Sequence, residues 1–416
     1  MIYKDLVIVG GGAAGLNAAI SAHKNGVRDI LIIEQSNRLG GILNQCIHNG
    51  FGLHWFKEEL TGPAFASKCI EELISLKIDY QLNATVTSIN NDKLIEVISL
   101  NGYDLISAKS VIFSVGCYER NRGAISIPGY RPNGIFTAGA AQKYLNEEGY
   151  LVGKKVFILG SGDIGLIMAR RMTLEGAKVL GVAEIMPYSN GLKRNIVQCL
   201  DDFEIPLFLS HTITNVFGKD NLEAIEISKV DKNFKPIVNS KKRIEVDTLL
   251  LSVGLIPDNN LIQLLDVEFD PISNRLVVDE KLNIGIPGIF ACGNGLHVHD
   301  LVDFVAEEAK IAGESAASFI FEEKFDTKTF EIEAGQGLSY ILPQKCHYNV
   351  KNVKVKGRVK KPIKKATIQF LVDDIIVKEI NKVNLFPSEM LDLNLTSIVL
   401  NKVKNKLRVK VIENDE

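Results

Sequence analysis

The chain has 416 residues, of which 46% are hydrophobic and 24% charged, and its formal net charge is -2. This composition is ordinary for a globular protein of two or three domains, and the balanced charge gives no reason to expect nucleic-acid binding. No apolar run reaches the ~18 residues of a transmembrane segment, and the first apolar run starts too close to Met1 to leave room for a targeting peptide. We therefore expect a cytoplasmic protein. Its six cysteines are scattered, without the spacing of a disulfide framework or a zinc site.

The first forty residues predict a strand, a glycine-rich turn, a helix and a second strand that ends at an acid. An apolar run over 6–9 leads into glycines with the spacing G-x-G-x-x-G. This spacing permits a tight turn, close approach of backbone amides to a pyrophosphate, and close packing of helix on strand. After the strand over 30–33, Glu34 is placed to bind a ribose hydroxyl. The residues of the turn that we expect to contact a dinucleotide are Gly10, Gly12, Ala13, Ala14 and Gly15.

The same pattern recurs near the middle of the chain. An apolar run over 155–159 leads into a second glycine turn, and the strand over 178–184 ends at Glu184. No Arg or Lys directly follows this acid, so a 2′-phosphate would meet a carboxylate without a compensating cation, and we expect NAD rather than NADP. Two such units indicate two dinucleotides, most economically a flavin and a nicotinamide. The second turn contributes Gly160, Gly162, Asp163, Ile164 and Gly165.

Two further apolar strands end at glycines, Gly116 and Gly254, where a ligand can approach the backbone closely. The chain then returns to the first unit through 288–294. Apolar residues at a 3.6 period predict a long helix after Asp300, with Asp300 as N-cap and Asp303 at the capping-box position. From about residue 330, alternating apolar and polar residues predict short strands of a small β domain.

These motifs together resemble the pyridine nucleotide-disulfide oxidoreductases, flavoproteins with two dinucleotide-binding domains such as thioredoxin reductase and NADH peroxidase. The resemblance implies FAD in the first unit and NAD(H) in the second. It also implies that Gly41, Gly293, Asn294 and Asp300 lie at the cofactors. The superfamily usually has an aspartate at position 294, which binds the ribityl chain; the carbonyl oxygen of Asn294 can replace it. We expect the N-terminus of the long helix to face the pyrimidine edge of the flavin.

The expected fold is α/β, with two Rossmann-like domains and a small C-terminal all-β domain. The FAD domain is discontinuous, and the NAD domain is inserted into it. The expected boundaries are 1–121 and 256–326 for the FAD domain, 122–255 for the NAD domain and 330–416 for the β domain.

A narrower resemblance rests on residues 41–52, 137–142 and 293–303. These look like the flavoprotein subunits found beside glycerol-3-phosphate dehydrogenase-like proteins, whose relatives include the alpha subunits of amino-acid, opine and cyanide-forming dehydrogenases. The resemblance implies a chain that handles NAD(H). Its partners would be a small cysteine-rich protein and a second flavoprotein dehydrogenase subunit. The sequence leaves the oligomeric state open, a homo-oligomer included.

Cys46 and His48 suggest the main alternative function, a self-sufficient NADH oxidase or peroxidase. Cys46 stands about where the superfamily keeps its redox-active cysteine, and a single cysteine there resembles the NADH oxidases and peroxidases, whose thiolate cycles through a sulfenic acid. His48 could lower the pKa of the thiol or donate a proton. The bland interpretation is a buried cysteine without a redox role, and a non-catalytic nucleotide-binding or redox-sensing protein is a third hypothesis. No C-x-x-C occurs, which disfavours a dithiol relay.

His297, His299 and Asp300 invite interpretation as metal ligands, with Asp303 close by. Nothing elsewhere in the sequence completes a ligand set, so we predict no metal site and assign these histidines to flavin contacts or to the path toward a partner.

Overall fold

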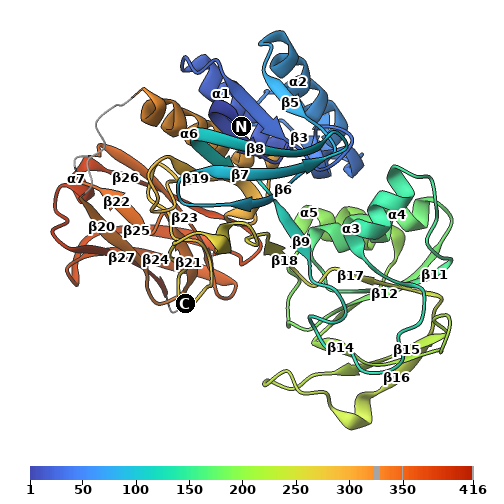
Figure 1. Cartoon of the computed structure of the whole chain (residues 1–416). Coiled ribbons are helices and arrows are strands. Elements are labelled where there is room, and N and C mark those ends of the chain that lie inside the picture. Colours follow the sequence, from blue (N-terminus) through green and yellow to red (C-terminus); the bar gives the residue numbers. More distant parts are fainter. Residues whose placement is uncertain (322–327, 349, 415–416) are drawn as a thin grey trace. The chain divides into compact units, whose positions relative to one another are not determined.

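The computed structural model describes residues 1–321, 328–348 and 350–414 (Figure 1). The chain divides into two compact units, one of Met1–Cys117 with Pro257–Glu416 and the other of Tyr118–Ile256. The predicted fold class is confirmed: the protein is mixed α/β with Rossmann-like sheets and a strand-rich C-terminal region.

The first unit is built on a sheet of order β5-β2-β1-β8-β7-β6, in which β19 also pairs with β8. The strands β5, β2, β1, β8 and β19 are parallel to their neighbours, whereas β6 and β7 join as antiparallel strands. The glycine turn therefore leaves the carboxyl end of a central strand, where α/β sheets bind ligands. The bounds are β1 Ile2–Val9, β2 Ile30–Ile33, β5 Asp79–Gln81, β6 Ala84–Ile89, β7 Leu94–Ser99, β8 Gly102–Phe113 and β19 Ile289–Ala291.

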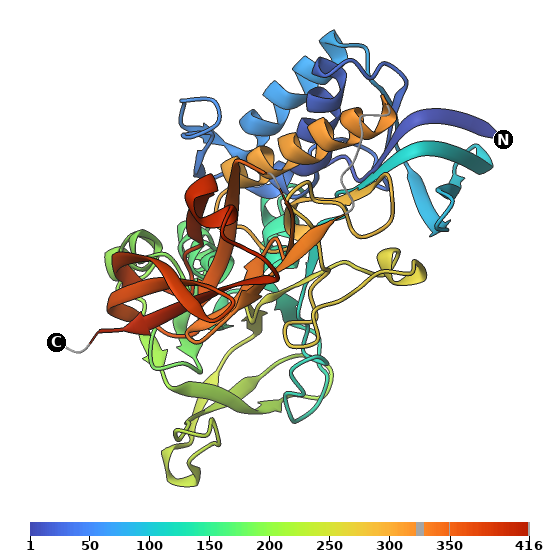
Figure 2. The ribbon, with the colours of Figure 1, turned by 90° about the vertical axis from the view of Figure 1, so that its left-hand side faces the viewer.

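The C-terminal region folds as two sheets that enclose one apolar core. One sheet has the order β22-β20-β27-β24-β25 and the other β21-β23-β26. Figure 2 shows these strands, in red and dark orange, next to the orange helix α6, Val302–Ile320. The bounds are β20 Thr329–Ala334, β21 Leu338–Leu342, β22 Lys345–His347, β23 Asn352–Val359, β24 Ile363–Val372, β25 Ile375–Leu385, β26 Leu391–Thr396, α7 Ser397–Leu400 and β27 Lys406–Glu413.

The second unit has a parallel sheet of order β10-β17-β11-β12-β13 and a separate antiparallel sheet β14-β15-β16. The chain passes between the two units twice, along the short strands β9 (Cys117–Glu119) and β18 (Leu255–Pro257). The bounds are β10 Ile135–Thr137, α3 Ala138–Asn146, β11 Lys155–Leu159, α4 Asp163–Leu174, β12 Lys178–Glu184, α5 Lys193–Cys199, β13 Leu207–Leu209, β14 His211–Phe217, β15 Ala224–Lys229, β16 Lys242–Glu245 and β17 Thr248–Leu251.

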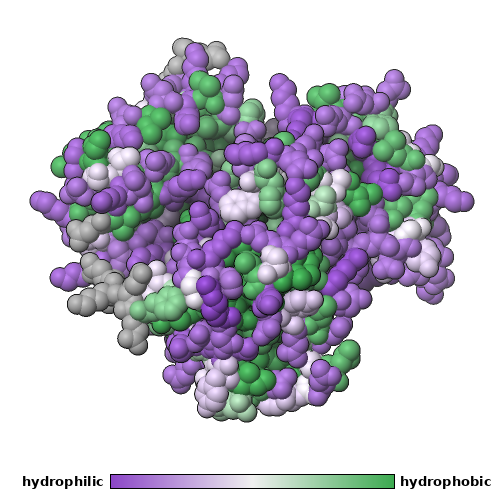
Figure 3. All heavy atoms as spheres, turned by 90° about the horizontal axis from the view of Figure 1, so that it is seen from above, coloured by the Kyte–Doolittle hydropathy of each residue, from purple (hydrophilic) through white to green (hydrophobic). Residues whose placement is uncertain are grey.

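Within the described residues, no helix combines the length and the apolar character that a membrane crossing requires. On the face drawn in Figure 3, hydrophilic residues predominate and hydrophobic ones gather in smaller groups among them.

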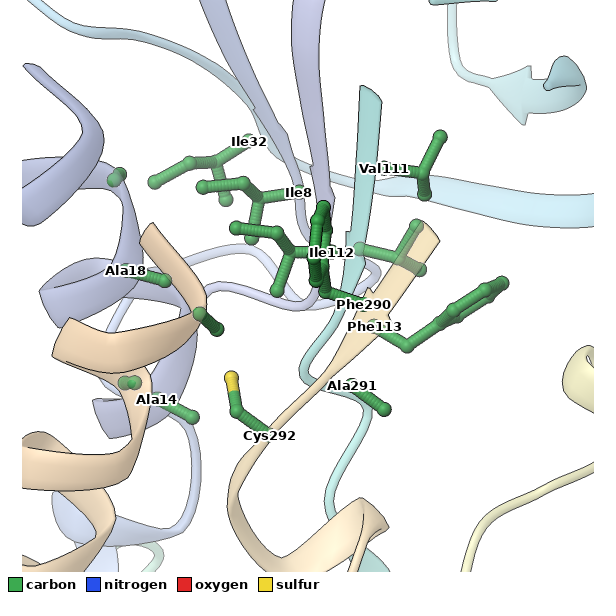
Figure 4. Packing of buried hydrophobic residues seen from close by; sticks show 14 of the residues in the cluster. Ile8, Ala14, Ala18, Ile32, Val111, Ile112, Phe113, Phe290, Ala291 and Cys292 are labelled. Carbon is green, nitrogen blue, oxygen red and sulfur yellow. The ribbon is translucent and has the colours of Figure 1, made fainter. Parts of the chain in front are cut away.

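The core of the first unit lies where helix α1 (Ala13–Lys24) and α6 pack against the sheet. Small residues let the two helices approach closely: a Cβ at Gly313 of α6 would lie only 2.4 Å from the carbonyl oxygen of Ala18 in α1. Figure 4 shows Ala14 and Ala18 on one side of this core, opposite Phe290 and Cys292. Helix α2 (Gly62–Ser75) and the strands β3 (Asn49–Phe51) and β4 (Leu60–Thr61) complete this part of the unit.

The predicted capping of the long helix is wrong. Helix α6 begins at Val302, and its N-cap is Leu301, without a side-chain hydrogen bond to the cap. Asp300 instead pairs with the guanidinium of Arg358 in β23, and its Oδ2 accepts a hydrogen bond from the backbone N–H of Met390. The Asp300 carboxylate therefore pairs with Arg358 of the C-terminal region and does not cap the helix, contrary to the prediction from the local sequence.

Candidate dinucleotide-binding sites

The first glycine turn is open toward the N-terminus of α1. Gly10 has φ +103°, and a Cβ there would lie 2.5 Å from the carbonyl oxygen of Ser114, so only glycine fits. Helix α1 begins after Gly12 without a side-chain cap, which leaves its first N–H groups for a ligand. A Cβ on Gly12 would meet only Gly41, at 3.9 Å. Uncapped N–H groups beside open space are what an anionic pyrophosphate requires.

Glu34 holds this turn from the end of β2. Its Oε2 accepts a hydrogen bond of 2.7 Å from the N–H of Gly11, and its Oε1 accepts one of 2.7 Å from the N–H of Ser36. The side chain is buried. A carboxylate has about four lone-pair sites, so these two bonds leave acceptor capacity beside the turn.

The second unit repeats this arrangement. Gly160 has φ +95°, and a Cβ there would lie 2.0 Å from the carbonyl oxygen of Ser252. Helix α4 follows Gly162, again without a side-chain cap. Buried Glu184, the last residue of β12, accepts hydrogen bonds from the N–H and the hydroxyl of Ser161, at 3.0 and 2.7 Å.

The remaining residues of the second turn also have roles within the fold. The Oδ1 of Asp163 accepts hydrogen bonds from the N–H of Leu192 and the side-chain amide of Asn195, at 2.8 and 2.6 Å. Gly165 donates its N–H to the Ser252 hydroxyl at 3.1 Å, and partly buried Ile164 packs against the core. Asp163 therefore links the start of α4 to the start of α5, in addition to the contact with a dinucleotide that the sequence predicts for it.

A cavity of about 610 Å³ opens in the second unit beside the carboxyl ends of β10 and β17. Arg122 and Arg131 both line it. The Arg122 guanidinium donates to a run of backbone carbonyls from Ile127 to Tyr130 and so shapes the loop. Burial and the neighbouring Arg131 lower the pKa of Arg122, as expected where two cations face one space.

The loop after β19 is held by Glu308 of α6. The Oε1 of Glu308 accepts a hydrogen bond of 2.8 Å from the N–H of Gly293. The Oδ1 of Asn294, for which the family resemblance implies a ribityl contact, accepts a hydrogen bond of 3.0 Å from the backbone N–H of His299. This oxygen therefore contributes to the shape of the loop itself.

The other carboxylate oxygen of Glu308 lies in a buried polar cluster. His297 Nε2 is 2.8 Å from Oε2, His299 Nε2 is 3.3 Å away, and the Lys356 ammonium of β23 is 3.6 Å away. Burial, with the neighbouring His299, lowers the pKa of His297 to about 3, so this ring is neutral at pH 7. Burial opposes the charge on Glu308, but the adjoining His299 and His297 hold the pKa of its carboxyl well below the usual value.

Asp303, at the start of α6, anchors the backbone of Gly52–Trp55, which follows Cys46 and His48 in the sequence. Its carboxylate is buried and accepts hydrogen bonds from the N–H groups of Gly52, His54 and Trp55, at 3.1, 2.8 and 2.8 Å. Partly buried Cys46 ends a short 3₁₀ helix over Gly41–Gln45. The ring of His48 lies 5.0 Å from that of Phe51.

Of the glycines expected at the cofactors, Gly41 packs against the first glycine turn, whereas Gly116 and Gly254 have space beside them. Gly41 lies against the first turn, since a Cβ on it would be 3.0 Å from the Cα of Gly12. Gly116 follows β8 with φ +76° and open space around it, and Gly254 follows β17 with φ +105°. The backbone at both positions is accessible to a ligand.

Comparison with known protein families identifies the family of this chain. The model of the pyridine nucleotide-disulphide oxidoreductase family matches residues 4–316. The chain belongs to this family. The family is FAD- and NAD(P)H-dependent, and the two uncapped helix ends of this oxidoreductase, each with a buried acid beside its glycine turn, fit two dinucleotides.

The curated relatives are distant. Hydrogen cyanide synthase subunit HcnB of Pseudomonas protegens is 26% identical over 63% of the chain, and an opine oxidase subunit of Agrobacterium tumefaciens is 23% identical over 76%. An alkyl hydroperoxide reductase subunit of Staphylococcus aureus is 25% identical over 70%. The chain spans 59%, 65% and 54% of the length of these three relatives.

Solved structures show the same fold. Thioredoxin reductase of T. acidophilum superposes with a TM-score of 0.62 at 24% identity, covering 78% of this chain and 99% of its own. L-proline dehydrogenase of P. horikoshii superposes with a TM-score of 0.52 at 18% identity, covering 77% of this chain and 56% of its own.

Sequence reasoning missed the residues that hold the flavoprotein's 293–299 loop. Glu308 stands among the apolar positions of α6 between Val305 and Ala312, and an acid on an apolar helix face is a signal of a buried polar contact. Lys356 and Tyr340 carry no comparable signal, because they lie on strands far along the sequence and reach the loop only through tertiary packing.

Proposed function

We propose that this protein is an FAD-dependent oxidoreductase that transfers hydride between NAD(H) and FAD, with FAD at the first glycine turn and NAD(H) at the second. The duplicated geometry carries this proposal: in each unit an uncapped helix follows the turn, and a buried acid, Glu34 or Glu184, bonds the turn's backbone. Bound FAD would supply the hydride chemistry, and the protein supplies binding and orientation.

The residues of the first unit have distinct tasks in this proposal. The N–H groups at the start of α1 bind the pyrophosphate, and Glu34 binds a ribose hydroxyl. Asp303 fixes the backbone of Gly52–Trp55 against the start of α6. The dipole of α6 favours negative charge at its N-terminus, as a reduced flavin requires.

Preference for NAD(H) follows from Glu184. Its carboxylate is buried and fixed by Ser161 and by the N–H of Met186. The residues after it, Ile185 and Met186, carry no cation. A 2′-phosphate would therefore meet a fixed negative charge at this position.

The finer role that we propose is the NADH-handling subunit of a multi-subunit dehydrogenase, such as a glycerol-3-phosphate dehydrogenase-like complex. A second flavoprotein and a small cysteine-rich protein would be its partners. Two relatives, of hydrogen cyanide synthase and opine oxidase, are named as subunits, which supports this role. The expected behaviour is NADH oxidation with artificial acceptors, but little turnover of a physiological substrate without the partner. Full turnover by the isolated chain would overturn the subunit role.

An anaerobic titration tests the core of the proposal. Purified protein is titrated with NADH and, separately, with NADPH while the flavin absorbance is followed. We expect stoichiometric bleaching by NADH and weak bleaching by NADPH. A flavin that NADH does not bleach would contradict hydride transfer in this chain, and equal bleaching by both nucleotides would contradict the role of Glu184.

A further inference from the structure

The buried cluster around Glu308 has the donor set of a metal site. His297, His299 and Glu308 each offer one ligand atom, and the three atoms lie within 4.8 Å of one another. Two imidazoles and one carboxylate suit divalent metals of the first transition row. The sequence around residues 297–303 did not reveal these three ligands together. The carboxylate belongs to Glu308 in the second turn of α6, and not to Asp300 or Asp303.

The proton on His299 can be assigned from its neighbours. The Oδ1 of Asn294 accepts the backbone N–H of His299 at 3.0 Å, which identifies this atom as the oxygen of the amide. The same Oδ1 lies 3.3 Å from His299 Nδ1, so Nδ1 is the atom that carries a proton. In a neutral ring, Nε2 is then a lone-pair donor.

That lone pair is directed at an anionic oxygen. His299 Nε2 lies 3.3 Å from Glu308 Oε2, the side chain is only 1% exposed, and Nε2 has no hydrogen-bond partner among the described residues. Two lone pairs face each other at this distance unless a cation lies between them or the ring takes up a second proton. A buried nitrogen aimed at a carboxylate in this way is the arrangement that a metal ion resolves.

The outer contacts of both histidines agree with this arrangement. His299 Nδ1 faces Asn294 Oδ1, and His297 Nδ1 lies 3.4 Å from the Tyr340 hydroxyl. Histidines that bind a metal usually donate their other ring N–H to such a group, which fixes the ring orientation. With metal–ligand bonds of ~2.0–2.2 Å, neighbouring donors in one coordination shell lie roughly 3 Å apart, close to the 2.8 and 3.3 Å seen here.

We propose that His297 Nε2, His299 Nε2 and Glu308 Oε2 form a binding site for one divalent first-row transition metal, with Zn²⁺ as the probe ion. The ion would join the 293–299 loop to α6. Lys356 is the competitor, since its ammonium lies 3.6 Å from the same Oε2 and pairs with it when no metal is bound.

The test is the metal content of the purified chain, measured by elemental analysis, together with Zn²⁺ titration of chelator-treated protein. We expect about one equivalent per chain, and at least ~10-fold weaker binding in His299→Gln and Glu308→Gln. His347→Gln is the matched control, because it removes the histidine of a separate cluster with Asp279 and Glu280 and should leave the metal unchanged. Circular dichroism and bound FAD report whether each variant is folded.

Lys356→Met separates a metal site from a simple ion pair without removing a ligand. If the site binds metal, loss of the ammonium should tighten Zn²⁺ binding severalfold. Folded wild-type protein that neither retains nor takes up a first-row metal would overturn the proposal. Metal retention that is unchanged in both His299→Gln and Glu308→Gln would also overturn the proposal. So would metal retention that is lost only in His347→Gln.

Discussion

The Oε1 of Glu308 accepts a 2.8 Å hydrogen bond from the backbone N–H of Gly293, so helix α6 directly holds the loop that follows β19. The bond joins residues fifteen positions apart, and the other oxygen of the same carboxylate reaches two histidines and a lysine of the C-terminal region. The loop of Asn294 is thus positioned jointly by α6 and by the β-rich region.

Glu34→Ala should weaken FAD binding. The change removes the acceptor of the Gly11 and Ser36 N–H groups, and with it the ribose contact that we propose for Glu34. Hydrogen bonds to a charged group contribute about 1.5–3 kcal/mol, so we expect at least a roughly tenfold loss of affinity. FAD per chain after gel filtration is the measurement, and exposed Glu59→Ala is the control. Full FAD retention in Glu34→Ala would show that the ribose position is assigned wrongly.

Glu184→Ala should raise the KM for NADH about tenfold and leave FAD content unchanged, because the change affects only the second turn. Glu184→Gln keeps an acceptor but removes the charge, so it should narrow the preference for NADH over NADPH. Steady-state kinetics with both nucleotides measure this, with exposed Glu148→Ala as control. An effect on FAD content with no change in KM would place the nicotinamide dinucleotide elsewhere.

Asp303→Ala should destabilise the first unit. Three backbone N–H groups, of Gly52, His54 and Trp55, lose their acceptor, and a buried donor without a partner costs about 1–3 kcal/mol. We expect the free energy of unfolding to fall by at least about 2 kcal/mol, with a smaller loss in Asp303→Asn. Glu307→Ala on the same helix breaks only a surface ion pair with Lys354 and should change little. Denaturant titration compares them, and equal stability of all variants would show that Asp303 is not an anchor.

Cys46→Ser tests the alternative chemistry. If hydride transfer needs no thiol, flavin reduction by NADH should change less than about twofold, because the cofactors supply the chemistry. Anaerobic stopped-flow measures flavin reduction, and a coupled assay measures peroxide turnover. Peroxide turnover that is present in the wild type and abolished in Cys46→Ser would instead support a sulfenic-acid cycle at this residue.

Asp279→Asn should stabilise the protein at alkaline pH. Burial and the neighbouring Glu280 raise the pKa of Asp279 to about 6, above the value of 3.8 in an unfolded chain. The stabilising effect of the protonated form is complete below 3.8 and is lost as the pH rises through 6. The neighbouring His347 partly opposes this rise in pKa, and the contacts of Asp279 with the Lys281 and Asn283 N–H groups survive in asparagine.

Thermal unfolding from pH 4 to pH 8 measures this effect. Asp279→Asn and wild type should agree at pH 4 and differ by on the order of 1–3 kcal/mol at pH 8, with the variant more stable. Asp231→Asn is the control, since Asp231 accepts the same pattern of N–H groups in a solvent-exposed turn. A variant that is less stable than wild type at pH 8 would contradict the sign of this prediction.

The sequence by itself determined the two glycine turns and the fold class. Each turn is a local device of strand, glycines, helix and acid within about 35 residues, and Gly10 and Gly160 have no alternative once their φ angles are positive. Hydrophobic periodicity likewise identified α6, because burial of one helix face is visible in the spacing of its apolar residues.

Only the tertiary structure decided what the polar residues around α6 do. Local rules assigned Asp300 to the helix cap, yet Arg358, 58 residues away in the sequence, takes its carboxylate. Asp303 accepts a hydrogen bond from the backbone N–H of Gly52, and the Glu308 carboxylate lies close to His297, His299 and Lys356. Buried charges need partners, and the partners come from whichever segments the packing brings close, so no local pattern could specify them.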